Sequence, residues 1–293
     1  RHVNSMPPEV ESKLLDFTVD GIQLGEVTPV TANLLVTTGP SVFELKTIDE
    51  KKYLSLSDTA GSTYESRTAA VEQVMLKLRD AGVVSGWRNE HYPISRGFYE
   101  EPVFSMERAA VPLVGALEYG VHINGYVTQD DGEVKMWMAR RAADKSKYPN
   151  MLDHIVAGGQ PVGVGLLENC IKECEEEAGI PEELTRAGIQ AAGAISYRSY
   201  VASKDVITRA VLFCYDLELP TSFQPVPIDG EVQDFFLWTM DDLKASMAPD
   251  FHDPIKPNCY PVKIDYLLRL GYISPDTPGY LDVLRELRSG DCF

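Results

Sequence analysis

The chain has 293 residues, is 44% hydrophobic and carries 44 acidic against 27 basic side chains, a formal net charge of −17. This length is enough for one full core and allows two domains. The acidic balance disfavours a nucleic acid partner, because binding to a phosphate backbone depends on clustered Lys and Arg. The chain lacks both a run of about 18 uncharged apolar residues and the layout of a secretory signal, so we expect a cytoplasmic protein with no membrane partner.

Two further features limit the class of protein. The cysteines are odd in number and show no C-x-x-C spacing, which favours packing residues in a reduced compartment over a disulfide framework or a zinc site. They are Cys170, Cys174, Cys214, Cys259 and Cys292. Residues 1–5 precede Met6, which resembles a natural start, and are left out of the fold argument.

The elements predicted in chain order divide the protein into two units. Residues 66–84 carry apolar side chains at helical spacing and predict a helix that Gly82 ends, whereas residues 86–113 predict loops and short strands. Residues 118–128 alternate and predict a strand, which an Asp-Asp-Gly turn joins to a second strand. Further strands are predicted over 194–220 and 231–240, and helices over 239–247, 260–273 and 279–290.

Strands on both sides of one central helix predict an α/β (α+β) sandwich. We place a smaller N-terminal α/β domain at residues 6–115 and the main domain, with C-terminal helices, at residues 116–293. One face of the strand over 118–128 carries His122, Asn124 and Tyr126. These side chains are candidates for lining a pocket, and the ordinary alternative is the wetter side of a sheet.

The central helix, within AGGQPVGVGLLENCIKECEEEAGI (157–180), has an unusual charge pattern. Glu173, Glu176 and Glu177 follow i, i+3, i+4 spacing, so three carboxylates converge beside an apolar arc that includes Leu167. Glu168 and Lys172 are predicted to form a surface pair on another arc. The ordinary alternative for the glutamates is a solvated charged face, but several converging carboxylates are also what a hard divalent cation binds.

The whole stretch resembles the Nudix box, G-x5-E-x7-R-E-U-x-E-E-x-G-U, in which U is a bulky aliphatic residue. Further segments, such as GWRNEHYP, ARRAADKSKYPNMLDHIVAGGQP and IDGEVQDFFLW, resemble blocks of Nudix proteins related to thiamine pyrophosphokinase, in which a domain of otherwise unknown function precedes the Nudix domain. This similarity covers most of the chain from about Gly86 to Trp238. It implies a Nudix α/β/α sandwich and an acid anhydride hydrolase that cleaves a diphosphate linkage.

The resemblance assigns roles within the box. It implies Mg²⁺ or Mn²⁺ bound by three glutamates, with Glu177 also in a catalytic role, and a glycine at the start of the motif. The matching residues are Gly158, Lys172 in place of Arg, Glu173, Glu176, Glu177, Gly179 and Ile180. One position departs from the box: its first glutamate falls on Val164, which cannot bind a metal, so the number of metal ions stays open.

Candidates outside the box are assigned by similar reasoning. Glu231 lies just before a tryptophan-bearing strand, where related enzymes place a general base, and the alternative is a surface glutamate at a strand start. Arg141 and Lys145 resemble a diphosphate-binding pair in isopentenyl diphosphate isomerase, and the alternative is a solvated hairpin edge. Arg88 and Arg198 are predicted to bind substrate, and the alternative is a tie between the two domains.

The predicted function is hydrolysis of oxidised or damaged thiamine diphosphate analogues to the monophosphate, because members of the resembled subfamily are associated with that activity. The alternatives are a Nudix pyrophosphatase for another nucleoside-diphosphate derivative and a non-catalytic binding protein with a Nudix fold. An isopentenyl diphosphate isomerase ranks low, because Ala157 occupies the position of the nucleophile-like cysteine. The expected partner is a small-molecule diphosphate, and the oligomeric state, a homodimer included, is left open.

Overall fold

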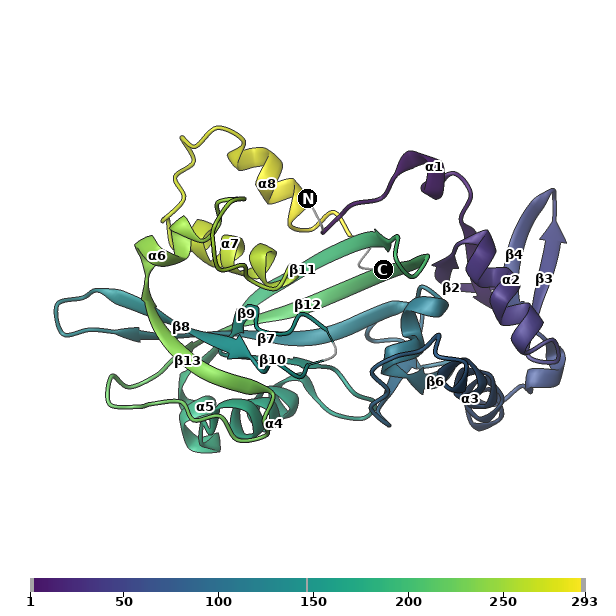
Figure 1. Cartoon of the computed structure of the whole chain (residues 1–293), viewed down its shortest axis with the longest axis horizontal. Coiled ribbons are helices and arrows are strands. Elements are labelled where there is room, and N and C mark those ends of the chain that lie inside the picture. Colours follow the sequence, from purple (N-terminus) through teal and green to yellow (C-terminus); the bar gives the residue numbers. More distant parts are fainter. Residues whose placement is uncertain (1–2, 146, 291–293) are drawn as a thin grey trace.

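The computed structural model of the chain describes residues 3–145 and 147–290, so Cys292 lies outside the described residues. A small N-terminal unit lies at one end of the molecule, and a larger unit holds a long sheet with helices on both faces (Figure 1). Among the residues described, no helix has both the length and the hydrophobicity needed to cross a membrane.

The N-terminal unit contains a four-stranded sheet in the order β2-β1-β4-β3 and a separate β5-β6 hairpin. Its elements are α1 (Pro8–Glu11), β1 (Leu15–Val19), β2 (Ile22–Val27), α2 (Pro29–Thr38), β3 (Phe43–Ile48), β4 (Lys51–Leu56), η1 (Asp58–Ala60), α3 (Tyr64–Asp80), β5 (His91–Ile94), β6 (Phe104–Glu107) and η2 (Arg108–Leu113). The helix predicted over 66–84 is confirmed as α3, which Thr63 caps and which buries Val71, Val74 and Met75.

The larger unit is organised around a mixed sheet in the order β11-β12-β7-β8-β13, with β10 paired to β7 and β9 paired to β8. Its strands are β7 (Leu117–Thr128), β8 (Val134–Arg141), β9 (Leu152–His154), β10 (Val156–Gly159), β11 (Ile189–Val201), β12 (Val206–Glu218) and β13 (Val232–Thr239). The predicted hairpin is confirmed by the antiparallel pairing of β7 and β8. Strand β7 also pairs in parallel with β12, which places β7 inside the sheet.

Helices cover both faces of this sheet (Figure 1). They are α4 (Leu166–Ala178) and α5 (Glu182–Gly188) on one face, and α6 (Met240–Ala245), α7 (Cys259–Arg269) and α8 (Tyr280–Glu286) on the other. Val121 and Ile123 of β7 pack in one core cluster with Cys170 and Cys174 of α4. This layering agrees with the predicted α/β/α sandwich.

The polar face of β7 differs from the wetter sheet face that we considered. His122 and Asn124 are buried, because α7 packs over this side of the strand. Asn124 donates to Asp216 at 3.0 Å, and Arg269 of α7 binds the same carboxylate. A covering helix thus turns the polar face of β7 into an internal polar layer.

The two units share a packed interface. Gly25 of β2 bridges to Ala116, and the N-terminal core cluster extends to Val206 of β12. Residues 4 and 5, which we left out of the fold argument, contact the larger unit, since the Arg198 N–H donates to Asn4 Oδ1 and the Tyr200 N–H donates to the Ser5 carbonyl. This interface holds β5 beside the end of β10, where the predicted site lies.

Candidate active site

Helix α4 presents its glutamates because its apolar arc is fixed in the core. Cys170, Cys174 and Ala178 are fully buried, and the helix ends at Gly179, which is left-handed with φ 63°. The Ile180 N–H donates to the Cys174 carbonyl at 3.0 Å, so the last turn closes as a glycine cap. The carboxylates on the adjoining arc must therefore face β10 and the cleft beside it.

Two details of this helix were predicted wrongly. Leu167 is exposed instead of buried, and the neighbouring Leu166 packs toward the core. Glu168 pairs with Arg186 of α5 at 3.0 Å, and the expected pair with Lys172 does not form. Lys172 instead binds glutamates of the predicted metal set, as the box arginine that it replaces usually does.

Glu177 is held against the backbone of β10. Its Oε2 accepts a hydrogen bond from the Ala157 N–H at 2.9 Å, and the residue is only 8% exposed. Burial raises the pKa of Glu177 well above its ordinary value, and the negative charges of Glu173 and Glu231 act in the same direction against the Ala157 hydrogen bond. A carboxylate placed in this way is stabilised by a nearby cation.

Glu173 packs directly over the box glycine. A Cβ atom at Gly158 would lie 2.2 Å from Cδ of Glu173, so only glycine leaves room for this side chain. Burial raises the pKa of Glu173, although Lys172 counteracts the shift from 3.2 Å. Glu176 is more open, with 51% of its side chain exposed, and it binds the same lysine at 3.1 Å.

These three glutamates, which we call the carboxylate cluster, fit a hard divalent cation. Glu173 and Glu177 have raised pKa values, and Lys172 pairs with Glu173 and Glu176 but not with Glu177. Oxygen donors of this kind suit Mg²⁺ and Mn²⁺. The side chain of Val164 has no oxygen to offer such an ion, and its backbone carbonyl accepts a hydrogen bond from the Gln160 side chain at 2.5 Å.

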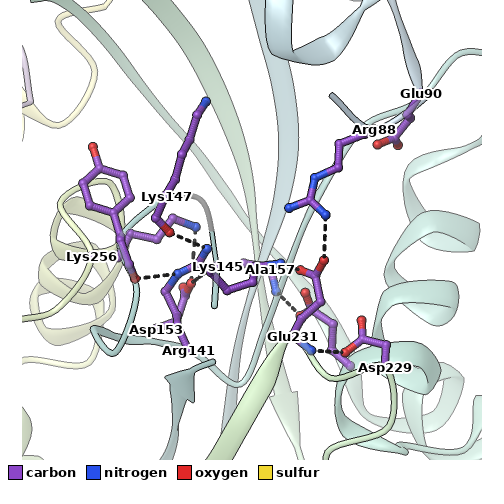
Figure 2. Close-up of polar contacts among 12 residues, drawn as sticks. Arg88, Glu90, Arg141, Lys145, Lys147, Asp153, Ala157, Asp229, Glu231 and Lys256 are labelled. Carbon is purple, nitrogen blue, oxygen red and sulfur yellow. Dashed lines mark hydrogen bonds and ion pairs between the residues drawn. The ribbon is translucent and has the colours of Figure 1, made fainter. Parts of the chain in front are cut away.

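Glu231 lies between two cations from opposite sides of the cleft. Lys145 forms an ion pair with its Oε2, and Arg88 of the N-terminal unit lies 3.7 Å from its Oε1 (Figure 2). Burial acts to raise the pKa of Glu231, but the Lys145 hydrogen bond and the charges of Lys145 and Arg88 outweigh it and lower this pKa. The carboxylate is therefore ionised at neutral pH and can accept a proton.

The predicted pair of Arg141 and Lys145 is not a free positive patch. Arg141 donates to Asp153 Oδ2 at 2.7 Å and to the carbonyl oxygens of Lys147 and Tyr148, so it shapes the loop after β8. Lys145, whose side chain is nearly buried, holds Glu231. Of the two, Lys145 is placed to exchange its carboxylate partner for a phosphate.

The N-terminal unit forms one wall of the site. Arg88 reaches Glu231 across the interface (Figure 2), whereas Glu90 pairs with Arg108. A Cβ atom at Gly159 would lie 1.4 Å from the Tyr92 hydroxyl, so this tyrosine of β5 lies directly on β10. Arg88 thus both links the two units and borders the cleft.

Arg198 lies elsewhere. Its guanidinium donates to Glu26 of β2 at 2.7 Å and to Glu11 of α1 at 2.8 Å. These contacts match the alternative of a tie between the two units. A role in substrate binding stays a prediction for this residue.

Sequence reasoning missed three groups beside the cleft. Lys147 and Lys256 lie near Arg141 and Asp153 in Figure 2, and Lys256 binds Asp153 at 3.3 Å. Burial raises the pKa of Glu118 to about 7, although the charges of Lys147 and Arg108 oppose the shift. Lys147 is part of the block that resembles a diphosphate site, so the sequence could have indicated that it lies near Arg141 and Lys145. Lys256 and Glu118 are brought to this region only by the fold.

Comparison with known proteins identifies the two units. The family model of a domain of unknown function (DUF4743) matches residues 1–118, and that of the NUDIX domain matches residues 118–259. The uncharacterized protein YJR142W of Saccharomyces cerevisiae is 32% identical over 92% of this chain and 81% of its own length. Residues 118–259 form a NUDIX domain that follows a DUF4743 domain. The Nudix α+β fold and the two-part family architecture are thereby confirmed.

Two further Nudix relatives give the range of similarity. Nudix hydrolase 24, chloroplastic, of Arabidopsis thaliana is 46% identical over 78% of this chain, which spans 61% of that protein's length. The NUDIX domain of Shewanella oneidensis NrtR, solved with ADP ribose, is 13% identical with a TM-score of 0.41, over 53% of this chain and 89% of that one. The narrower assignment to thiamine-pyrophosphokinase-related proteins stays a prediction.

Proposed function

We propose that this Nudix protein is a metal-dependent hydrolase of a small-molecule diphosphate. The observation that carries the proposal is the carboxylate cluster: Glu173 and Glu177 are fixed by Gly158 and by the Ala157 N–H, and their pKa values are raised. Buried carboxylates that favour a cation, beside Lys145 and Arg88, suit a substrate with several phosphate oxygens.

In this proposal, Glu173, Glu176 and Glu177 hold Mg²⁺ or Mn²⁺. The ion supplies positive charge to the phosphate oxygens and lowers the pKa of water. When substrate binds, Lys145 and Arg88 leave Glu231 and bind phosphate oxygens instead, which orients the diphosphate. The Glu231 carboxylate is then free to accept a proton. Glu231 then accepts a proton from the attacking water, the water oxygen bonds to phosphorus, and the bond to the bridging oxygen breaks.

We further propose oxidised analogues of thiamine diphosphate as substrates, with the monophosphate and inorganic phosphate as products. Support comes from the sequence blocks described above. Thiamine diphosphate carries a cationic thiazolium, whereas the oxidised ring is neutral, so a cation beside the pocket favours the damaged form. A cytoplasmic location stays a prediction.

The test is phosphate release from a panel that contains thiamine diphosphate, its oxo analogue, ADP-ribose and NADH. We expect turnover with Mg²⁺, none after chelation and recovery when Mg²⁺ returns. If only a nucleotide is turned over, the proposed diphosphate hydrolysis stands but the proposed thiamine substrate is wrong. No turnover on any member, with or without metal, would favour the non-catalytic alternative.

A further inference from the structure

A second polar cluster lies on the face of the sheet opposite the carboxylate cluster. His122 of β7, His154 of β9 and Cys259 of α7 bring three ligand atoms within 4.8 Å of one another. The two imidazole rings meet edge to face, with centroids 4.9 Å apart. The residues are 4%, 1% and 0% exposed, so the cluster is closed to solvent. We call it the imidazole–thiol cluster.

Within the described part of the chain, neither imidazole makes a hydrogen bond to another side chain, although a weak contact with the Val121 backbone acts to raise the pKa of His122. Both ring nitrogens of His122 and both of His154 are buried without a hydrogen-bond partner among the residues that the structure describes. Buried polar atoms are almost always hydrogen-bonded, so four orphaned nitrogens in two touching rings call for a missing partner. A neighbouring proton donor would satisfy only one nitrogen, whereas a cation at the point where the rings meet would satisfy one nitrogen of each.

The donor set suits a particular kind of ion. Burial lowers the pKa of His122 to about 3 and that of His154 well below its ordinary value, so both rings are neutral and carry a free lone pair. The third donor is sulfur, and the Cys259 thiol is oriented by a hydrogen bond to Asp153 Oδ1 at 2.8 Å. Nitrogen and sulfur donors in one site select Zn²⁺ or a similar ion over Mg²⁺.

The spacing is close to what such an ion requires. Ligand atoms of a tetrahedral zinc site lie about 3.3–3.6 Å apart, as follows from zinc–nitrogen and zinc–sulfur bonds of about 2.0 and 2.3 Å. The three atoms lie within 4.8 Å of one another, so side-chain rotations that shorten a separation by at most about 1.2–1.5 Å reach this geometry. When the thiol proton leaves, Asp153 loses the hydrogen bond from the sulfur, and Lys256 at 3.3 Å balances the charge of its carboxylate.

We propose that His122, His154 and Cys259 form a structural zinc site that fastens the start of α7 to β7 and β9. Binding of the ion releases the thiol proton of Cys259 and forms one zinc–sulfur and two zinc–nitrogen bonds. The cluster is separate from the carboxylate cluster, and the proposal does not depend on the hydrolase activity.

Two lysines oppose a cation here. Lys256 binds Asp153 at 3.3 Å, and Lys263, one turn after Cys259, donates to the Met136 sulfur at 3.3 Å. Burial lowers the pKa of Lys263 to about 8, so its positive charge is readily given up. Removal of this lysine should therefore tighten zinc binding, which a cluster with only a packing role would not show.

The test uses Co²⁺ as a visible substitute for Zn²⁺. The full chain is expressed in minimal medium with Co²⁺, because a closed site loads as the chain folds. We expect about one Co²⁺ per chain that survives desalting, with a thiolate-to-cobalt absorption band that carboxylates cannot produce. Cys259→Ser should abolish the band, and Cys214→Ser, a buried cysteine of another cluster, should keep it.

Affinity measurements complete the test. Zn²⁺ competition against a chromophoric chelator should give at least tenfold weaker binding for His154→Gln and at least threefold tighter binding for Lys263→Met. If a variant fails to fold, as judged by circular dichroism, the wild-type band decides alone. Wild-type protein without the band, a band that survives in Cys259→Ser, or unchanged affinity in folded His154→Gln would overturn the proposal.

Discussion

The two faces of the central sheet carry polar clusters of opposite chemistry. The carboxylate cluster comes from one helix, offers only oxygen atoms and includes Glu176, whose side chain is 51% exposed. The imidazole–thiol cluster comes from three separate elements, offers nitrogen and sulfur and is closed to solvent. Hard oxygen donors, one of them exposed, suit an ion that must meet substrate and water, whereas closed nitrogen and sulfur sites suit an ion that only holds the fold.

The difference also explains how each cluster is held. Glu173 and Glu177 are positioned by backbone groups of β10, so the carboxylate cluster keeps its shape without an ion and allows the metal ion to be exchanged. The imidazole nitrogens have no hydrogen-bond partner within the described part of the chain. The comparison implies that loss of metal stops turnover on one face and loosens α7 on the other.

The largest effect is expected at Glu177. Replacing it with Gln removes one anionic oxygen ligand while keeping the hydrogen bond from Ala157, so kcat should fall by about three powers of ten with the fold intact. Steady-state phosphate release measures this. Glu175→Gln is the matched control, since Glu175 is exposed on the same helix. Equal turnover in the two variants would make the carboxylate cluster a solvated face.

The next effect concerns the cations that hold Glu231. Lys145→Ala and Arg88→Ala should each raise KM for the diphosphate by about tenfold, or about 1.4 kcal/mol of binding, because each removes a phosphate partner. Lys244→Ala, at an exposed position of α6, should leave KM unchanged. A KM that stays at the wild-type value in both site variants would exclude their role in binding phosphate.

A similar factor is expected for substrate choice. The ratio of kcat/KM for the oxo analogue to that for thiamine diphosphate should be at least about ten, since one repulsive contact with the thiazolium supplies about 1.4 kcal/mol. The same assay on Arg88→Ala asks whether this cation contributes. Equal values for the two thiamine compounds would mean that the pocket does not sense ring charge.

The smallest effect is on stability. The pKa of Glu177 is raised in the folded protein, so folding favours its protonated form, and stability is lost as pH rises above the ordinary glutamate pKa. Without metal at pH 7.5, Glu177→Gln should therefore raise Tm by about 2–4 °C, as about 1 kcal/mol would in a chain of this size. The gain should shrink toward pH 4 and with added Mg²⁺, as differential scanning calorimetry can show. A lower Tm in metal-free Glu177→Gln would show that the Glu177 charge does not destabilise the fold.

The sequence predicted what was local. The glutamate spacing and helix α3 follow from periodicity over a few turns, whereas Gly158 was assigned through the resemblance to the Nudix box; in the structure, Gly158 lies against Glu173 of α4. Thr239, at the start of the helix predicted over 239–247, caps α6 with a capping box. The four-stranded N-terminal sheet was missed, although Asp20 and Gly21, both with positive φ, form a recognisable hairpin turn.

The contacts that only the fold creates could not be predicted. His122, His154 and Cys259 span 138 positions of the sequence, and their spacing carries no motif, so Cys259 was assigned to packing. Arg141 and Lys145 lie close in sequence, yet their partners Asp153 and Glu231 come from different strands or loops. The sequence shows that Arg141 and Lys145 are positively charged. Which carboxylate each of them pairs with depends on the tertiary structure.

Mn²⁺ binding, followed by electron paramagnetic resonance, tests the division between the two faces most directly. The wild-type protein, Glu177→Gln and Cys259→Ser are titrated with Mn²⁺ under identical conditions. We expect Glu177→Gln to weaken Mn²⁺ binding at least tenfold and Cys259→Ser to leave it unchanged, because Mn²⁺ prefers oxygen ligands. Wild-type affinity in Glu177→Gln, or a loss confined to Cys259→Ser, would contradict the assignment of the hard metal to the carboxylate cluster.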